Sequence, residues 1–276
     1  MYIIAKWKLI ISFVEGNETT DRDEKSIIDF KIKENNRLSD LYSLLKLVPT
    51  EGKLPEILPG QFVQVEVSNS KTTYLRRPIS VNFVDYEKQE LWLLVRKAGE
   101  GTAALIEKRE GESVNIVLPL GKGFSVTGNQ MLLIGGGVGV APLLYLGKKA
   151  KEQGVDVKFL LGARSAADLL ELDEFEKYGE VYVSTEDGSM GEKGFVTQHS
   201  VLRSGSFDHI SCCGPAPMMK AVAKIAKDID VCCEVSLENV MACGIGACLC
   251  CVEDTTEGNV CVCKEGPVFN IERLKW

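Results

Sequence analysis

The sequence has no cysteine in its first 211 residues, and its only two histidines are His199 and His209. Neither histidine lies in a motif that indicates a general base. No apolar run is long enough to span a bilayer, since the nearest candidate, Met131–Gly147, is interrupted by glycines and a proline. The net charge of −7 argues against a protein that binds nucleic acid or an anionic membrane.

The N-terminal residues contain no clear secretory signal. Met1–Val14 includes two lysines and only a short apolar run, and no small-residue cleavage site is evident. We therefore expect a cytoplasmic protein. Residues 1–26 are predicted to form an N-terminal extension with no function of their own.

All ten cysteines lie between Cys212 and Cys263. Disulfide frameworks usually stabilise small secreted domains, whereas this chain is long and has no apparent secretion signal. Thiols that are concentrated at one end of such a chain favour metal or redox chemistry.

Residues 27–128 are predicted to form an antiparallel β-barrel. Gln61–Val67 alternates apolar and polar side chains, which is typical of a half-buried strand. A short helix is expected to begin at Thr102, with the threonine hydroxyl as its cap. Similar short runs predict strands at Ile27–Ile32, Tyr42–Val48, Ile79–Val84, Leu91–Val95 and Ser113–Val117.

Residues 129–232 change to an alternation of strands and helices, which predicts an α/β domain with a doubly wound parallel sheet. Residues 233–276 follow as a small cysteine-rich tail. Strands are expected at Met131–Ile134, Val157–Leu161, Val181–Ser184 and His209–Cys213, and helices at Val140–Gln153, Ala167–Tyr178 and Pro215–Asp228.

The strongest motif lies in the tail. Cys243, Cys248, Cys251 and Cys263 are spaced C-x4-C-x2-C-x11-C, and the first three have the spacing of plant-type 2Fe–2S ligands. Gly244 and Gly246 would let the loop close around sulfur and offer unhindered backbone N–H groups. A structural zinc site is the alternative. Cys250 and Cys261 compete for the third and fourth ligand positions.

A second motif combines Arg76-Arg77-Pro78-Ile79-Ser80 with Gly99-Glu100-Gly101-Thr102. A flavin dinucleotide needs positive charge at its pyrophosphate, which an arginine fork supplies. The glycines allow the backbone to approach the ligand, and a helix N-terminus favours an anion. The predicted flavin contacts are Arg77, Pro78, Ser80, Gly99, Gly101 and Thr102.

A third motif, residues 135–142, reads Gly-Gly-Gly-Val-Gly-Val-Ala-Pro between a buried strand and a helix. It departs from G-x-G-x-x-G, but its backbone can cradle a pyrophosphate. Cys213 precedes Gly214-Pro215 at the end of a later strand, where open α/β sheets bind ligands; the alternative is a buried core thiol. The predicted nucleotide contacts are Gly135, Gly137, Gly139 and Pro142.

The order of these motifs resembles that of the ferredoxin–NADP reductase superfamily. The tail, at residues 238–248 and 263–269, resembles more narrowly the electron-transfer subunits of dihydroorotate dehydrogenase B. The resemblance covers the chain from about residue 27 to its C-terminus. It implies FAD on the barrel, NAD on the sheet domain with Cys213 near the nicotinamide, and a 2Fe–2S cluster in the tail.

The resemblance also implies an activity and a partner. Electrons would pass from dihydroorotate, through FMN in a catalytic subunit, to the cluster, FAD and NAD, as part of pyrimidine biosynthesis. The complex would be a heterotetramer with two copies of each subunit, and this chain alone would not oxidise dihydroorotate.

Two other functions stay open at this point. One is a subunit of an NADPH-linked ferredoxin or sulfide reductase, for which Arg164-Ser165 could bind the 2′-phosphate. The other is a zinc-binding, nucleotide-sensing interaction protein without redox activity.

Overall fold

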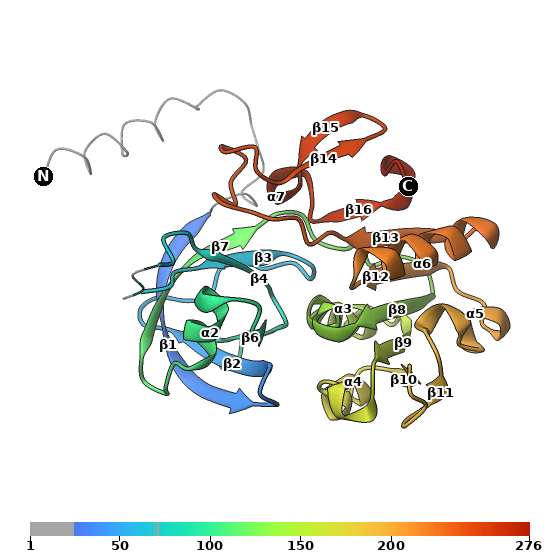
Figure 1. Cartoon of the computed structure of the whole chain (residues 1–276), viewed down its shortest axis with the longest axis horizontal. Coiled ribbons are helices and arrows are strands. Elements are labelled where there is room, and N and C mark those ends of the chain that lie inside the picture. Colours follow the sequence, from blue (N-terminus) through green and yellow to red (C-terminus); the bar gives the residue numbers. More distant parts are fainter. Residues whose placement is uncertain (1–24, 69, 71) are drawn as a thin grey trace, which may run out of the picture.

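The computed structural model describes residues 25–68, 70 and 72–276. Figure 1 shows a curled antiparallel sheet beside an α/β sheet, with the C-terminal segment lying over both. The predicted order of an antiparallel domain followed by an α/β domain is confirmed. The predicted N-terminal extension lies outside the described residues, apart from residues 25 and 26.

The secondary-structure elements are mainly strands in the first part of the chain, and strands alternate with helices in the second part, as the sequence indicates. They are β1 (Ser26–Arg37), β2 (Tyr42–Pro49), β3 (Phe62–Val65), β4 (Arg77–Ser80), β5 (Phe83–Asp85), β6 (Glu90–Arg96), α2 (Glu100–Ile106), β7 (Ser113–Leu120), β8 (Gln130–Gly136), η1 (Gly137–Val140), α3 (Ala141–Glu152), β9 (Asp156–Ala163), η2 (Ala166–Asp168), α4 (Leu172–Glu176), β10 (Glu180–Thr185), β11 (Glu192–Lys193), η3 (Val196–Gln198), α5 (Val201–Ser204), β12 (His209–Cys213), α6 (Ala216–Asp228), β13 (Cys232–Ser236), β14 (Val252–Thr255), β15 (Gly258–Cys261), α7 (Val262–Glu265), β16 (Val268–Asn270) and η4 (Ile271–Arg273).

The first sheet has the strand order β4-β3-β7-β1-β2-β6-β5, and every pair is antiparallel. Its edge strands β4 and β5 are joined only by Val81 and Asn82. The N–H of Val81 bonds to Gln61 O, and that of Asn82 bonds to Trp92 O. These bonds draw the two edges together, so the sheet curls toward a barrel. The single strand expected at Ile79–Val84 is therefore two strands with a corner between them.

The second sheet has the strand order β11-β10-β9-β8-β12-β13-β16 and is parallel except for β16. Alternate residues of its strands enter different cores. Leu133 on β8 packs with α3 and α4, whereas Leu132 packs with α6 and η3. Helices thus cover both faces of the sheet, which explains why its central strands are apolar on both sides.

Two details of the α/β region differ from the sequence prediction. The helix expected at Ala167–Tyr178 is broken into η2 and α4 because Glu171 between them has φ of 57°, in the left-handed region. The boundary expected between residues 232 and 233 falls inside β13, which pairs with β12 in the α/β sheet.

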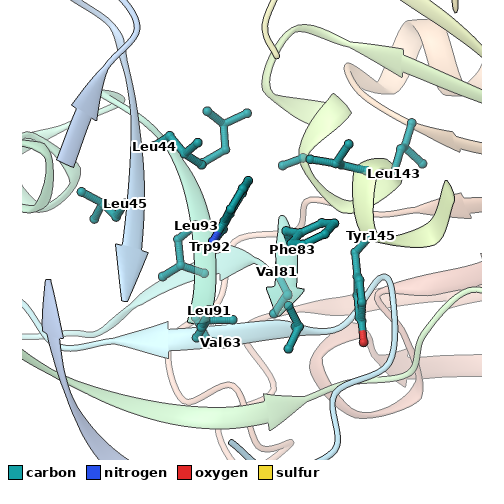
Figure 2. Close-up of a cluster of buried hydrophobic side chains, with 14 of the residues drawn as sticks. Leu44, Leu45, Val63, Val81, Phe83, Leu91, Trp92, Leu93, Leu143 and Tyr145 are labelled. Carbon is teal, nitrogen blue, oxygen red and sulfur yellow. The ribbon is translucent and has the colours of Figure 1, made fainter. Parts of the chain in front are cut away.

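The two sheets meet along a buried aromatic seam. Figure 2 shows Val81, Phe83 and Trp92 of the curled sheet beside Leu143 and Tyr145 of α3. The ring of Phe83 lies 4.9 Å from that of Trp92 and 6.0 Å from that of Tyr145, between centroids. Burial of each such apolar side chain stabilises the folded protein by roughly 1.5–3 kcal/mol.

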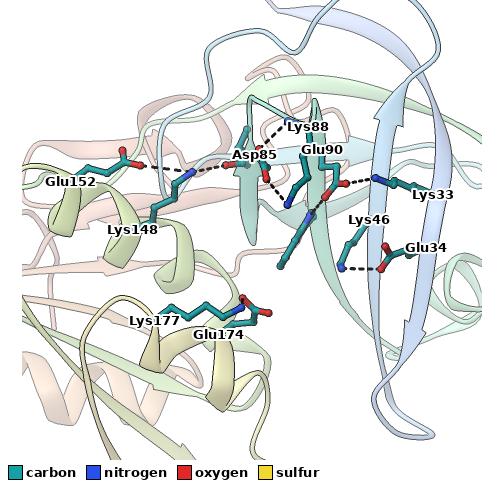
Figure 3. A network of polar contacts seen from close by, with 12 residues as sticks. Lys33, Glu34, Lys46, Asp85, Lys88, Glu90, Lys148, Glu152, Glu174 and Lys177 are labelled. Carbon is teal, nitrogen blue, oxygen red and sulfur yellow. Dashed lines mark hydrogen bonds and ion pairs between the residues drawn. The ribbon is translucent and has the colours of Figure 1, made fainter.

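Polar contacts cross the same seam. Lys148 of α3 donates to Val84 O at 3.3 Å and pairs with Glu152 at 3.7 Å, within the network drawn in Figure 3. The aromatic packing and the bond from Lys148 to Val84 therefore join the two domains.

The C-terminal segment belongs structurally to both domains. Its strand β16 extends the α/β sheet, while Lys122 after β7 donates its backbone N–H to Gly266 O at 2.6 Å. Phe62 of β3 shares a core with Val262 and Cys263 of α7. The C-terminal segment, which carries the cysteine loop, is consequently anchored to both domains. No helix among the described ranges is both long and apolar enough to cross a membrane.

Candidate functional site

The two halves of the predicted flavin motif meet in space. An added Cβ on Gly101 would lie 2.5 Å from Arg77 Nε and 3.1 Å from Thr73 Cγ2, so a side chain there would displace Arg77. Arg77 Nε is buried and has no hydrogen-bond partner among the described residues. An unpaired arginine donor beside a side-chain-free backbone suits the pyrophosphate of a flavin dinucleotide.

The two adjacent arginines have different surroundings. Arg76 Nη1 donates to Asn115 O at 2.9 Å, and its Nη2 pairs with Glu66 at 3.2 Å. Arg76 is thus fixed to the curled sheet, which leaves Arg77 as the arginine available to a ligand.

Pro78 and Ser80 are half-buried and lie on the opposite face of β4 from Arg77, because strand side chains alternate. The strand is at the edge of its sheet, so backbone groups along its outer side remain available to a ligand. The structure thus brings together Arg77 and Gly101 but separates Arg77 from the side chains of Pro78 and Ser80.

The prediction for Thr102 needs a correction. Helix α2 begins at Glu100, and Thr102 lies within its first turn. Its hydroxyl accepts the N–H groups of Ala98 at 2.8 Å and Gly99 at 3.1 Å. Thr102 therefore fixes the loop by bonding backward, while an added Cβ on Gly99 would meet open space.

The glycine-rich turn and the Cys213 motif also converge. An added Cβ on Gly139 would lie 2.5 Å from Cys213 O and 2.6 Å from Gly214 N. Strand β8 pairs with β9 on one side and β12 on the other, so the chain order reverses between β8 and β12. The motifs therefore meet at the topological switch point, where open α/β sheets bind nucleotides.

The residues of this turn do different things. Gly137 has φ of +57° and open space where a Cβ would be, so its backbone faces an accessible region. Gly135, Gly139 and Pro142 are buried: an added Cβ on Gly135 would lie 2.8 Å from Val140 Cγ1, and Pro142 lies in the first turn of α3. Of the four predicted nucleotide contacts, Gly137 is therefore the one whose backbone is accessible to a ligand. Gly135, Gly139 and Pro142 are buried and determine the shape of the turn.

The Cys213 thiol is fully buried at the end of β12. Burial, with a smaller effect from Glu238, raises its pKa well above the ordinary value, although Ser236 opposes this. A protonated, buried thiol is a poor nucleophile. The thiol thus has the environment of the alternative, a buried core residue, and its place near the nicotinamide stays a prediction.

Backbone N–H groups of the cysteine loop point at the predicted ligands. Gly244 and Gly246 have φ of +72° and +82°, and this left-handed backbone turns neighbouring amides inward. The bonds are Gly246 N to Cys263 Sγ at 3.1 Å, Ala247 N and Ile245 N to Cys243 Sγ at 3.3 and 3.4 Å, and Cys263 N to Cys251 Sγ at 3.4 Å.

These bonds favour the thiolate of Cys243, whereas burial and then Cys251 raise the pKa of Cys263 to about 12 despite the N–H of Gly246. Partial burial opposes ionisation of Cys243, yet the N–H groups of Ile245, Cys248 and Ala247 outweigh it and lower its pKa to about 6. Among the described residues, no group of three or more histidine, cysteine, aspartate or glutamate side chains is arranged to hold a metal ion.

The competing cysteines have weaker geometry. Cys250 is exposed, and within the described part of the chain no backbone N–H donates to its thiol or to that of Cys261. Cys261 is near the ligand candidates, since burial and then Cys251, Cys243 and Cys248 raise its pKa. The hydrogen-bond pattern therefore favours Cys251 and Cys263.

Two residues at these sites carry no sequence signal. Thr73 packs against Gly101 beside Arg77, and Gln64 of β3 lies against Gly244 of the cysteine loop. Both environments arise from distant segments, and no local spacing pattern marks either residue.

Comparisons with known proteins agree with this arrangement. Residues 238–275 match the iron-sulfur cluster binding domain of dihydroorotate dehydrogenase B, and residues 133–224 match an oxidoreductase NAD-binding domain. The solved structure of an NADH-dependent reduced ferredoxin-NADP oxidoreductase superposes with a TM-score of 0.80 at 30% identity, covering 90% of each chain.

Two curated relatives are electron transfer subunits of NAD(+)-dependent dihydroorotate dehydrogenase B. The protein from Bacillus velezensis is 41% identical over 88% of this chain and 96% of its own length. The one from Bacillus pumilus is 43% identical over 78% of this chain and 85% of its own. The chain belongs to the family of electron-transfer subunits of dihydroorotate dehydrogenase B.

Proposed function

We propose that this chain relays electrons from the flavin of a dihydroorotate-oxidising partner, through a 2Fe–2S cluster and FAD, to NAD. One observation carries the proposal most directly. The segment that matches the cluster-binding domain directs its backbone N–H groups at Cys243, Cys251 and Cys263. With Cys248 these cysteines would be the four cluster ligands.

Each cofactor has residues that fit it. Arg77 would bind the FAD pyrophosphate beside Gly101, and the edge of β4 would offer backbone groups to the flavin ring. Bound FAD would exchange two electrons with NAD and single electrons with the cluster. The chain's own part is to hold these groups in order between the two packed domains.

The NAD site lies at the switch point between β8 and β12. Gly137 would approach the dinucleotide backbone, and the buried Cys213 would pack beside the nicotinamide without bonding to it. Hydride transfer needs two aligned rings, and a protonated, buried thiol excludes water from the reacting face without competing as a nucleophile.

Exposed apolar side chains surround the cysteine loop and suit a protein partner. Val240 is 78% exposed and Leu249 65%, and Ile245 and Val252 are also exposed. Leu249 has φ of 58°, an unusual conformation for a leucine. We propose that this loop surface docks on an FMN-containing catalytic subunit, in a heterotetramer with two copies of each chain. None of the ten cysteines, all of which the structure describes, forms a disulfide, and this suits the cytoplasmic location that we propose.

Substitution on this surface tests the partner. Leu249→Asp and Val240→Asp should abolish co-purification with the catalytic subunit while leaving iron and FAD bound. Leu41→Asp is the matched control, since Leu41 is also exposed but lies at the β1–β2 turn, away from the C-terminal segment in Figure 1. Undiminished complex formation by Leu249→Asp would contradict the docking surface.

A second function, an NADPH-linked reductase subunit, has one supporting observation. Arg164 is exposed directly after β9, the neighbour of β8 at the nucleotide site. The ratio of kcat/KM for NADH and NADPH separates the two, and our proposal predicts a preference for NADH.

A further inference from the structure

Gln64 lies on the wall between the flavin domain and the cysteine loop. Its neighbours Val63 and Val65 point into the core of the curled sheet. Phe62 faces the other way, into the core that contains Cys251 and Cys263. Because side chains alternate along β3, Gln64 shares the face of Phe62 and points toward the C-terminal segment. Across the ladder it lies opposite Pro78 of β4.

The amide of Gln64 is buried without a partner. The residue is 1% exposed, and neither Nε2 nor Oε1 has a hydrogen bond within the described part of the chain. Gln61, at the start of the same segment, is also buried, but its Oε1 accepts from Leu58 N at 2.7 Å and its Nε2 donates to Gly121 O at 2.8 Å. A native fold rarely leaves both ends of a buried amide unpaired.

The contact of Gln64 with the loop shows what faces it. An added Cβ on Gly244 would lie 2.8 Å from both Cγ and Nε2 of Gln64. Gly244 directly follows Cys243 and precedes the amides that donate to the thiols. The absence of a side chain there allows the amide to approach the loop next to Cys243.

We propose that Gln64 Nε2 donates a hydrogen bond to a sulfide of the 2Fe–2S cluster and so raises the reduction potential of the cluster. This inference rests on the proposed cluster ligands. Sulfur accepts such bonds, and a donor stabilises the reduced cluster, which is the more negative state. Gln64 would then be the side-chain donor from the flavin domain, complementing the backbone donors of the loop.

Redox titration of the FAD- and cluster-loaded chain, followed by electron paramagnetic resonance, tests this. Gln64→Met keeps the length of the side chain but has no donor, so the cluster potential should fall while iron, sulfide and FAD contents stay at wild-type levels. Gln64→Glu puts an acceptor in the same place and should lower the potential further. In protein labelled with ¹⁵N at glutamine side chains, pulsed electron paramagnetic resonance should detect a coupling between the reduced cluster and an amide nitrogen. Gln64→Met should remove this coupling.

Gln61→Met is the matched control, and it should leave the cluster potential unchanged because its amide partners are Leu58 and Gly121. An unchanged cluster potential in Gln64→Met, or a shift in the FAD potential alone, would overturn the inference. The assignment of the cluster ligands has a separate test, because it predicts that Cys263→Ser loses iron whether or not Gln64 donates to the cluster.

Discussion

Replacing Glu171 with glutamine should stabilise the protein above neutral pH. Glu171 Oε2 accepts from Asn82 Nδ2 at 3.0 Å, and this bond joins the corner of the curled sheet to the connection before α4. Among the described residues, Glu171 Oε1 and Asn82 Oδ1 are both buried without partners. Burial raises the pKa of Glu171 to about 7, with a contribution from Glu174, while Asn82 and Lys46 oppose the rise.

The magnitude follows from the shift. The carboxyl ionises near 4.5 in the unfolded chain and near 7 in the folded protein. Between these values the folded state holds the proton that the unfolded state has lost, so stability falls as pH rises from about 4.5 to about 7 and is level above. A shift of this size corresponds to at most about 3 kcal/mol. Glutamine cannot ionise, so Glu171→Gln avoids this loss, and its amide can both accept from and donate to Asn82.

The assay is urea denaturation of the FAD-loaded protein, followed by far-ultraviolet circular dichroism at about pH 5 and about pH 8. The advantage of Glu171→Gln over wild type should be small at the lower pH and reach up to about 3 kcal/mol at the higher. Glu176→Gln is the control, because Glu176 is exposed on the same helix and is not among the groups that shift the pKa of Glu171. Equal differences at both pH values would refute the buried, protonated carboxyl.

Three further predictions concern the cofactors. Arg77→Ala should purify with much less FAD, measured by absorbance. Arg76→Ala should keep FAD but lose about 1–3 kcal/mol of stability in denaturation, since only the side chain of Arg76 is bonded to the sheet. Equal FAD loss in both variants would contradict the site. Cys263→Ser should lose iron and acid-labile sulfide in a chemical assay, and Cys261→Ser should retain them; the opposite result would move the fourth ligand. Cys213→Ala should slow reduction of the flavin by NADH in stopped flow roughly 10-fold or more while FAD stays bound, as expected for misaligned rings, and a stable adduct on Cys213 during turnover would refute its role.

The predictable features are those that depend on local spacing. The cysteine pattern and the glycine-rich turn were identifiable because their residues are close in sequence and the loop backbone that connects them makes the contacts itself. The apolar runs of β8 and β9 likewise predict buried strands, since both faces of their sheet are covered.

The features that escaped prediction depend on contacts between distant segments. The sequence predicted Arg77 as the flavin contact, but the bond that fixes Arg76 to Asn115 of β7, and so separates the roles of the two arginines, could not be predicted. Gln64 looks like the polar face of an ordinary half-buried strand until the cysteine loop covers it. Glu171 breaks the expected helix by adopting a left-handed backbone while bonding to Asn82, which belongs to the other domain.

The most direct test of the electron relay is NADH formation from dihydroorotate and NAD by purified subunits. The account predicts none from this chain alone, sustained formation when the FMN-containing catalytic subunit is added, and loss of that activity when Cys263→Ser removes the cluster. Dihydroorotate-dependent NADH formation by the single chain, or an undiminished rate from the complex without its cluster, would contradict it.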